Sequence, residues 1–173
     1  MKRFLILLAI LVVVAISTAM EVAYMDFPKT QAVTIRVDDY AKMGEAFGKL
    51  GWWAGPQGLI GPKTLWLSIY HANMITIPEK PTPIDAAITV EGDVKPGEGM
   101  ILQDIGGGKY AKYVYKGPYD KIHEAWRAVI NEIEKSKIYK SADKPSLLVY
   151  LNRPGQVKPE DLVTEIYLPV EPK

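Results

Sequence analysis

The stretch KYAKYVYKGPYDKIHEAWRAV, residues 109–129, joins a strand pattern to a helix pattern. Its first part, YAKYVY (110–115), is a tyrosine-rich run of the kind found in β-strands. Pro118 then stands where the first turn of a helix would begin, and apolar residues recur at helical spacing from Tyr119 to Ile133. The stretch therefore predicts a strand that leads directly into an amphipathic helix.

The same order of elements occurs earlier in the chain. The helix pattern YAKMGEAF (40–47) aligns with YDKIHEAW (119–126) at a constant offset of 79 residues. Each helix is preceded by one predicted strand and followed by two, which gives strands at 32–37, 64–71 and 84–93 in the first half and at 110–115, 145–152 and 162–170 in the second. The fold class is therefore predicted as α+β, with duplicated β-α-β-β modules (about 28–95 and 96–173) in one domain, 21–173.

One further strand is expected outside this repeat. The segment MILQDI (100–105) precedes three glycines and the strand at 110–115, so a hairpin between these two strands is predicted across Gly106–Gly108. The glycine triplet lacks the spacing and the Lys-Ser/Thr ending of a phosphate loop. We therefore interpret it as a turn.

Side-chain alternation along each strand sorts the residues between the two faces of the predicted antiparallel sheet. Aliphatic sets such as Leu147 with Val149 are expected under the two helices, and Tyr113 and Tyr115 are placed opposite Ala111. The remaining residues are expected to line a concave ligand groove on the face that the helices leave open. They are Trp66, Ser68, Tyr70, Tyr113, Tyr115, Leu148, Tyr150, Glu165 and Tyr167.

The aromatic character of this predicted face favours binding. A single tyrosine on an open sheet face is ordinary amphipathic cover, but a large aromatic surface usually marks a binding site. Aromatic rings offer stacking and cation–π contacts, and phenol hydroxyls offer orienting hydrogen bonds. The glycine- and proline-rich segment 52–63 is a possible lid, with Trp52 or Trp53 closing over a ligand.

Composition argues against several other functions. The chain has 173 residues, a net charge of +1 and no cysteine. This near-neutral balance lacks the basic character typical of nucleic-acid binding, and a cluster of lysines (109, 112, 116 and 121) is interpreted as a solvated face. His71 and His123 have no metal-ligand spacing, so neither a metal nor another cofactor is expected.

The first 20 residues form a separate segment. Lys2 and Arg3 precede the charge-free run Phe4–Met20, and small residues at 17–19 suggest cleavage after Ala19. This order predicts a signal peptide or, if uncleaved, a hydrophobic helix that anchors the chain in a membrane. Both alternatives place the rest of the chain outside the cytoplasm.

The runs GGKYAKYVYKGPYDKIHEAW (107–126) and PSLLVYLNRPGQVKPEDLVTEIYLPV (145–170) resemble the GyrI-like small-molecule-binding domain. This family also forms the effector-binding half of multidrug-responsive bacterial transcription regulators. The resemblance, strongest over 97–170, implies two β-α-β-β modules with an aromatic pocket for flat, often cationic or hydrophobic compounds. It also implies a glutamate in the strand before Tyr-Leu-Asn, where this chain has Leu148. Glu165 is a candidate substitute, or else a rim residue bonded to a lysine or the backbone.

Three functions follow as hypotheses. The first is an extracytoplasmic or membrane-tethered module that binds a small, flat, mainly hydrophobic or cationic molecule as a sensor, carrier or sequestering protein. The second is a hydrolase in which Glu165 acts with Tyr150 or Tyr167, although Leu148 argues against catalysis. The third is an interaction module for an unidentified protein of the cell envelope.

Overall fold

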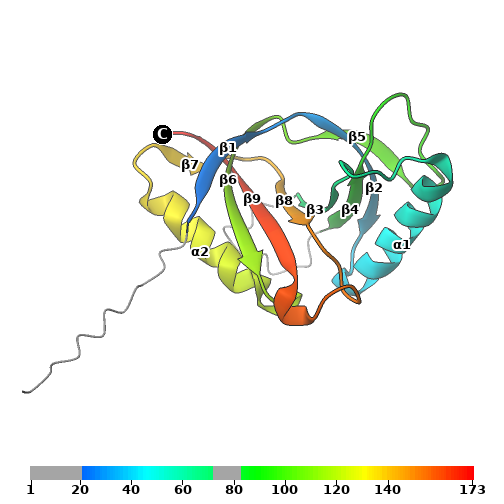
Figure 1. The fold of residues 1–173 in the computed structure, drawn as a ribbon. Coiled ribbons are helices and arrows are strands. Elements are labelled where there is room, and N and C mark those ends of the chain that lie inside the picture. Colours follow the sequence, from blue (N-terminus) through cyan, green and yellow to red (C-terminus); the bar gives the residue numbers. More distant parts are fainter. Residues whose placement is uncertain (1–20, 72–82) are drawn as a thin grey trace, which may run out of the picture.

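The computed structural model describes residues 21–71 and 83–173 and has the predicted α+β class. The chain forms two successive modules with the same order of elements, which are labelled in Figure 1. The first consists of β2 (Thr30–Val37), α1 (Met43–Ala54), β3 (Trp66–Tyr70) and β4 (Ile84–Thr89). The second consists of β6 (Gly108–Lys116), α2 (Ile122–Lys135), β8 (Ser146–Tyr150) and β9 (Val163–Pro172). The predicted duplication of β-α-β-β units is therefore present.

Short elements complete the described part of the chain. Three strands lie outside the repeat: β1 (Ala23–Phe27), β5 (Ile101–Ile105) and β7 (Tyr139–Ser141). Single 3₁₀ turns flank the helices and β9: η1 (Tyr40–Lys42), η2 (Gly55–Gln57), η3 (Tyr119–Lys121) and η4 (Pro159–Asp161). The first turn begins at Asp39, whose carboxylate accepts a hydrogen bond from the backbone N–H of Ala41 at 2.9 Å.

The strands form one curled antiparallel sheet in the order β1-β6-β9-β8-β3-β4-β2-β5, with β7 paired to the end of β9. The two modules meet where β3 pairs with β8, and Ser68 lies directly opposite Leu148 in this pair. The order β8-β9-β6 on one side mirrors β3-β4-β2 on the other. A pseudo-twofold axis therefore passes between β3 and β8.

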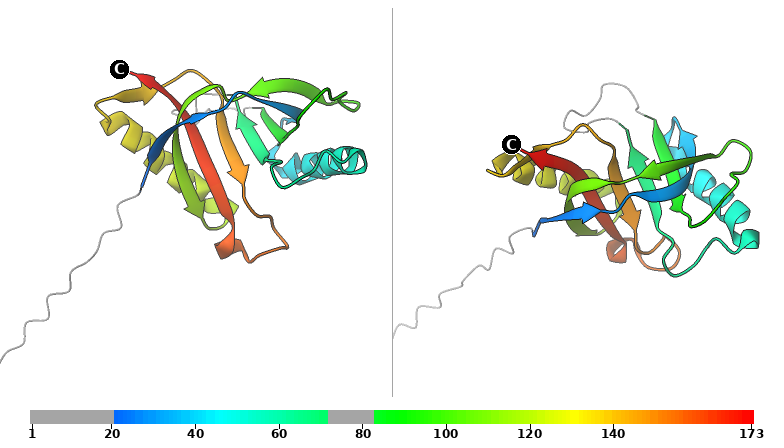
Figure 2. Two further views of the ribbon diagram at one scale, coloured as in Figure 1. Left: turned by 45° about the horizontal axis from the view of Figure 1, so that its top comes forward. Right: turned by 90° about the horizontal axis from the view of Figure 1, so that it is seen from above.

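Each of the two outermost strands of the sheet pairs with the module that lies farther from it along the chain. β1 pairs with β6 of the second module, while β5 pairs with β2 of the first, so the predicted hairpin between β5 and β6 is wrong. The β1–β2 and β5–β6 ribbons cross over the top of the molecule (Figures 1 and 2). At the crossing Gly106 has φ +73°, and a Cβ there would lie 2.6 Å from the carbonyl oxygen of Pro28, so only glycine fits.

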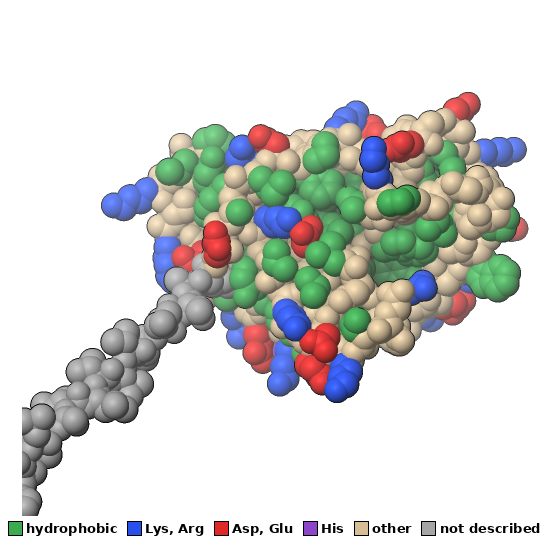
Figure 3. Space-filling view, viewed as in Figure 1, with side chains coloured by type: hydrophobic (Ala, Val, Ile, Leu, Met, Phe, Trp, Pro, Cys, Tyr) green, Lys and Arg blue, Asp and Glu red, His purple; other side chains and the backbone are tan. Residues whose placement is uncertain are grey.

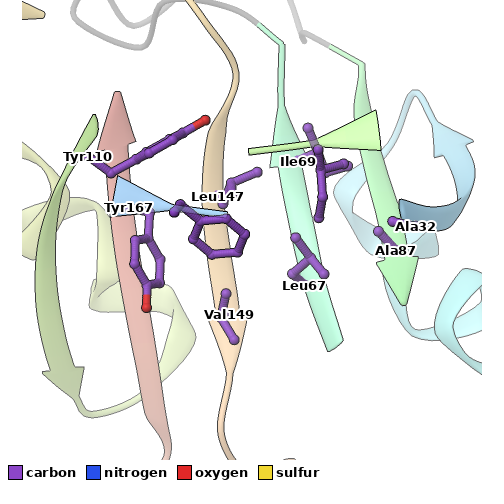
Figure 4. Packing of buried hydrophobic residues seen from close by; sticks show 10 residues of the cluster. Ala32, Leu67, Ile69, Ala87, Tyr110, Leu147, Val149 and Tyr167 are labelled. Carbon is purple, nitrogen blue, oxygen red and sulfur yellow. The ribbon is translucent and has the colours of Figure 1, made fainter. Parts of the chain in front are cut away.

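Both faces of the central strands are buried. On one face, α1 and α2 cover separate hydrophobic clusters. On the other, the crossing ribbons contribute Phe27 and Ile105 to a third cluster that fills the curl of the sheet. Figure 4 shows Leu67 and Ile69 from β3 with Leu147 and Val149 from β8 in this cluster. The prediction of an open groove opposite the helices is therefore wrong, because a core occupies that space.

The predicted N-terminal signal or anchor, residues 1–20, lies outside the described residues. Within the described ranges no helix is both long and apolar enough to cross a membrane.

Candidate ligand-binding site

A cavity of about 1100 Å³ opens on the helix-bearing face, between α1 and the segment that follows β8. Figure 3 shows hydrophobic side chains lining a recess on the α1 side of the molecule. Ligand sites usually have volumes of roughly 300 to 1000 Å³, so this cavity is large enough for a drug-sized compound. Its lining residues are Tyr40, Ala41, Met43, Gly44, Phe47, Gly48, Gly51, Trp52, Gly55, Pro56, Trp66, Tyr119, Tyr150, Leu151, Asn152, Arg153, Pro154 and Gln156.

Glycines on one side of α1 keep this cavity open. Gly44, Gly48, Gly51 and Gly55 follow one another at intervals of four, three and four residues, so they share a helix face. A Cβ at Gly44 or Gly48 would have no heavy atom within 4 Å. Alanine would favour the helix by about 1 kcal/mol at a position inside α1 such as Gly48. The glycines therefore leave space at some cost in helix stability.

Aromatic rings form the floor of the cavity where the two modules meet. Tyr150 at the end of β8 lies between rings from both modules. Its ring centroid is 5.7 Å from that of Phe47 on α1, in an edge-to-face arrangement, and 5.4 Å from that of Tyr119 at the start of the second helix. Phe47 also contacts Trp66, with ring centroids 6.1 Å apart. Such contacts hold the rings in fixed positions for a flat ligand.

Phenol hydroxyls supply most of the polar character of the floor. The hydroxyls of Tyr150 and Ser68 lie 2.7 Å apart, and Ser68 is fully buried beneath Tyr150. Burial, together with the nearby Tyr40, raises the pKa of Tyr119 to about 12. Burial likewise raises the pKa of Tyr150 well above its ordinary value. Both phenols are therefore protonated at neutral pH and able to donate hydrogen bonds.

Comparison with known proteins identifies the family. Residues 20–171 match the model of the GyrI-like small-molecule-binding domain. The chain belongs to this family. A DNA gyrase inhibitor of Escherichia coli (strain K12) is 30% identical over 132 residues, which cover 75% of this chain and 82% of that protein.

Solved structures share the GyrI-like fold. The C-terminal domain of EcmrR aligns with a TM-score of 0.70 at 20% identity, covering 88% of this chain and 98% of that one. SAV2435, solved bound to tetraphenylphosphonium, aligns with a TM-score of 0.55 at 17% identity, covering 88% and 94%. At these identities the similarity is one of fold.

The GyrI-like domain brings together only some of the residues predicted for its site. Trp66, Tyr150 and Trp52 line the cavity, and Ser68 lies directly behind Tyr150. Trp52 is 85% exposed at the rim, whereas Trp53 packs against the α1 cluster and lies outside the lining.

The predicted distribution between the faces is reversed on three strands. Trp66, Ser68 and Tyr70 of β3 and Leu148 and Tyr150 of β8 all point toward the helices, because aliphatic residues of these strands fill the opposite cluster. Tyr113 and Tyr115 also face α2, since they follow Ala111 at intervals of two residues and must share its face. The residues that pack under α2 without lining the cavity are Tyr70, Tyr113, Tyr115 and Leu148.

Glu165 and Tyr167 lie on the opposite face, as the alternation in β9 predicted, and so do not meet the cavity. Glu165 is bonded to Lys112 at 2.6 Å and accepts a hydrogen bond from the hydroxyl of Tyr167 at 2.8 Å. Lys112 also lies 5.5 Å from the centroid of the Tyr167 ring. Glu165 therefore belongs to a local ion pair on β6 and β9. It does not replace the glutamate that the family resemblance implied at the position of Leu148, which is buried on the helix-facing side.

Many lining residues were not predicted as site residues, among them Tyr40, Phe47, Tyr119, the glycines of α1 and the segment 151–156 with Arg153. The sequence contains a signal for some of them. Tyr40 and Tyr119 occupy equivalent places in the repeat at the offset of 79 residues. Glycines at helical spacing within a predicted helix also indicate a face that must stay empty.

A second polar cluster lies away from the cavity. Asp85 on β4 is buried and accepts hydrogen bonds from Arg36 at 2.7 Å, from Gln103 at 3.1 Å and from His71 at 2.7 Å. Burial opposes ionisation of Asp85, but these donors outweigh it and hold the pKa of the carboxyl below its ordinary value. Within 21–71 and 83–173 no group of three or more acidic, histidine or cysteine side chains is arranged to hold a metal. Within this cluster the ion pair between Arg36 and Asp85 links β2 to β4.

Proposed function

We propose that this chain binds a small, flat, mainly hydrophobic molecule in the cavity between α1 and residues 151–156. The observation that carries the proposal is the cavity itself, which has an aromatic floor and a glycine-lined wall. Membership of a small-molecule-binding family supports it. So does the structure of SAV2435, a protein with the same fold that was solved bound to tetraphenylphosphonium. The molecule would be sensed, carried or sequestered.

The energetics are adequate for specific binding. A drug-sized ligand gains about 0.3 kcal/mol per non-hydrogen atom, so roughly 25 atoms give about 7 to 8 kcal/mol, or a Kd in the low micromolar range. Burial of aromatic surface would supply most of this energy, and the protonated hydroxyl of Tyr119 would orient polar atoms of the ligand.

The cellular setting is part of the same proposal. Lys2 and Arg3 followed by the apolar run to Met20 support export, either as a secreted protein or as a domain tethered to the membrane. Intact-mass measurement of the chain from the soluble and membrane fractions tests this, because cleavage after Ala19 removes a defined mass.

Binding is tested by titrating the purified chain with N-phenyl-1-naphthylamine, an uncharged aromatic probe that becomes fluorescent in apolar sites. We expect saturable binding that weakens by about ten-fold in Tyr119→Ala, a loss of about 1.4 kcal/mol. Glu165→Gln is the matched control, because Glu165 lies on the other face and its loss should leave the affinity unchanged. Absence of saturable binding, or a loss in the control alone, would contradict the proposal.

A further inference from the structure

The formal charge at the cavity is positive. Arg153, in the segment after β8, lines the cavity, is exposed, and forms no ion pair with another described residue. The described lining contains no aspartate or glutamate. The acidic residues next to lining residues along the chain are not themselves part of the lining: Asp39 caps the turn at Ala41, Glu45 pairs with Lys49 at 2.8 Å, and Asp120 is exposed beside Tyr119.

The polar groups on the cavity floor add to this positive character. The hydroxyl of Tyr119 is protonated and can donate to an acceptor, whereas the hydroxyl of Tyr150 is engaged with Ser68 at 2.7 Å. Asn152 contributes little to a ligand, because its amide donates to the carbonyl of Asp161 at 2.9 Å and accepts from the N–H of Val163 at 2.8 Å. The available groups therefore suit an acceptor better than a donor.

A cation would meet an unfavourable environment here. Transferring a charge from water into an apolar site is costly unless an opposite charge compensates it. Aromatic faces offset part of this cost through cation–π contacts, but Arg153 at the mouth repels a second positive charge. An anion has the opposite balance, since Arg153 attracts it and the hydroxyl of Tyr119 can donate to it.

We propose that the cavity favours an anionic aromatic ligand over a cationic one of the same shape, and that Arg153 sets this preference. This inference rests on the proposed function, because it concerns the ligand class of the same site. The expected ligand is an aromatic compound that carries a carboxylate, a sulfonate or a similar acidic group.

A pair of ions with one shape and opposite charges tests the preference. Tetraphenylborate and tetraphenylphosphonium are each titrated, at low ionic strength, against the full chain loaded with N-phenyl-1-naphthylamine, and the displacement of the probe is followed. We expect tetraphenylborate to displace the probe at a concentration at least about ten-fold lower.

Two variants isolate the contribution of Arg153. The preference is expressed as the displacing concentration of tetraphenylphosphonium divided by that of tetraphenylborate. Arg153→Glu should reduce this ratio by about ten-fold, since reversing an exposed charge changes the two affinities modestly and in opposite senses. Arg127→Glu makes the same change on the exposed side of α2, outside the lining, and should leave the ratio unchanged. This control also accounts for adsorption of hydrophobic ions to other parts of the chain.

The outcomes separate the two proposals. If the uncharged probe itself does not bind, the proposed function fails. If the probe binds but tetraphenylphosphonium displaces it as well as tetraphenylborate does, or neither ion displaces it, only the charge preference is overturned. The role of Arg153 is refuted if Arg153→Glu and Arg127→Glu give the same ratio as the unchanged chain.

Discussion

Side chains introduced into the glycine-lined wall of the cavity should affect protein stability and ligand binding in different ways. Gly48 lies in the middle of α1, faces the cavity, and has no heavy atom within 4 Å of the position a Cβ would take. Gly48→Ala should therefore raise the free energy of unfolding by about 0.5 to 1 kcal/mol, because alanine loses less backbone freedom on folding and meets no clash. Urea denaturation followed by circular dichroism measures this change.

A larger side chain at the same position should block the ligand. The ring in Gly48→Phe would occupy space beside Phe47 and Trp66, which form part of the aromatic floor. We expect the affinity for N-phenyl-1-naphthylamine to fall by at least about ten-fold, equivalent to about 1.4 kcal/mol, while the chain remains folded.

The neighbouring residue provides the control for this experiment. Lys49→Phe introduces the same ring on the exposed side of α1, outside the lining, at the cost of an exposed ion pair with Glu45 worth about 0.3 to 0.5 kcal/mol. Its affinity for the probe should match that of the unchanged chain. The reasoning is refuted if Gly48→Phe binds the probe within about twofold of the unchanged chain, or if Gly48→Ala is destabilising.

Three other substitutions test separate parts of the structure. The buried hydroxyl of Thr164 has no hydrogen-bond partner among the described residues, so Thr164→Val should leave the free energy of unfolding unchanged or raise it by up to about 1 kcal/mol in urea denaturation; a loss would contradict this. Asp85 has a lowered pKa, so its contribution is present above its ordinary pKa of about 4 and is lost as the pH falls through the folded value. Asp85→Asn should therefore cost about 2 kcal/mol at pH 7 and less under strong acid, and a cost independent of pH would count against the ion pair. Trp52→Ala should change stability by less than about 0.5 kcal/mol, because the side chain is exposed, yet weaken probe binding by about threefold; unchanged affinity would remove Trp52 from the site.

Local sequence patterns were sufficient to predict the order of the repeated elements and of β5, but they did not indicate β1 or β7. The strand at 110–115 and the helix after it appear as β6 and α2, and the repeat at an offset of 79 residues appears as two modules. These features depend on alternation and helical spacing within short segments. The pairing of β1 and β5 across the modules depends on contacts between distant segments, and no local pattern indicates it.

The assignment of faces failed for a physical reason. β3 and β8 are central strands that are buried on both sides, so aliphatic residues do not mark the helix side. Leu147 and Val149 pack under the crossing ribbons, and the larger aromatic residues face the helices, where the cavity leaves room for rings. The prediction for Tyr113 and Tyr115 was wrong for another reason: residues two positions apart in a strand share a face, so both tyrosines belong on the face of Ala111.

The aromatic residues of the predicted site were thus partly correct, although their face was wrong. Trp66 and Tyr150 line the cavity, whereas Glu165 and Tyr167 lie behind the sheet. The empty side of α1 was missed although its glycines recur at helical spacing, because a glycine is usually interpreted as a break in a helix and not as space reserved within one.

A crystal structure of the chain with bound N-phenyl-1-naphthylamine would show which face of the sheet holds the ligand. We expect density for the naphthalene ring within about 4 Å of Phe47, Trp66 and Tyr150, on the helix-bearing face and next to the glycines of α1. Density for the ligand against Lys112 and Glu165 on the opposite face, with an empty cavity, would contradict it.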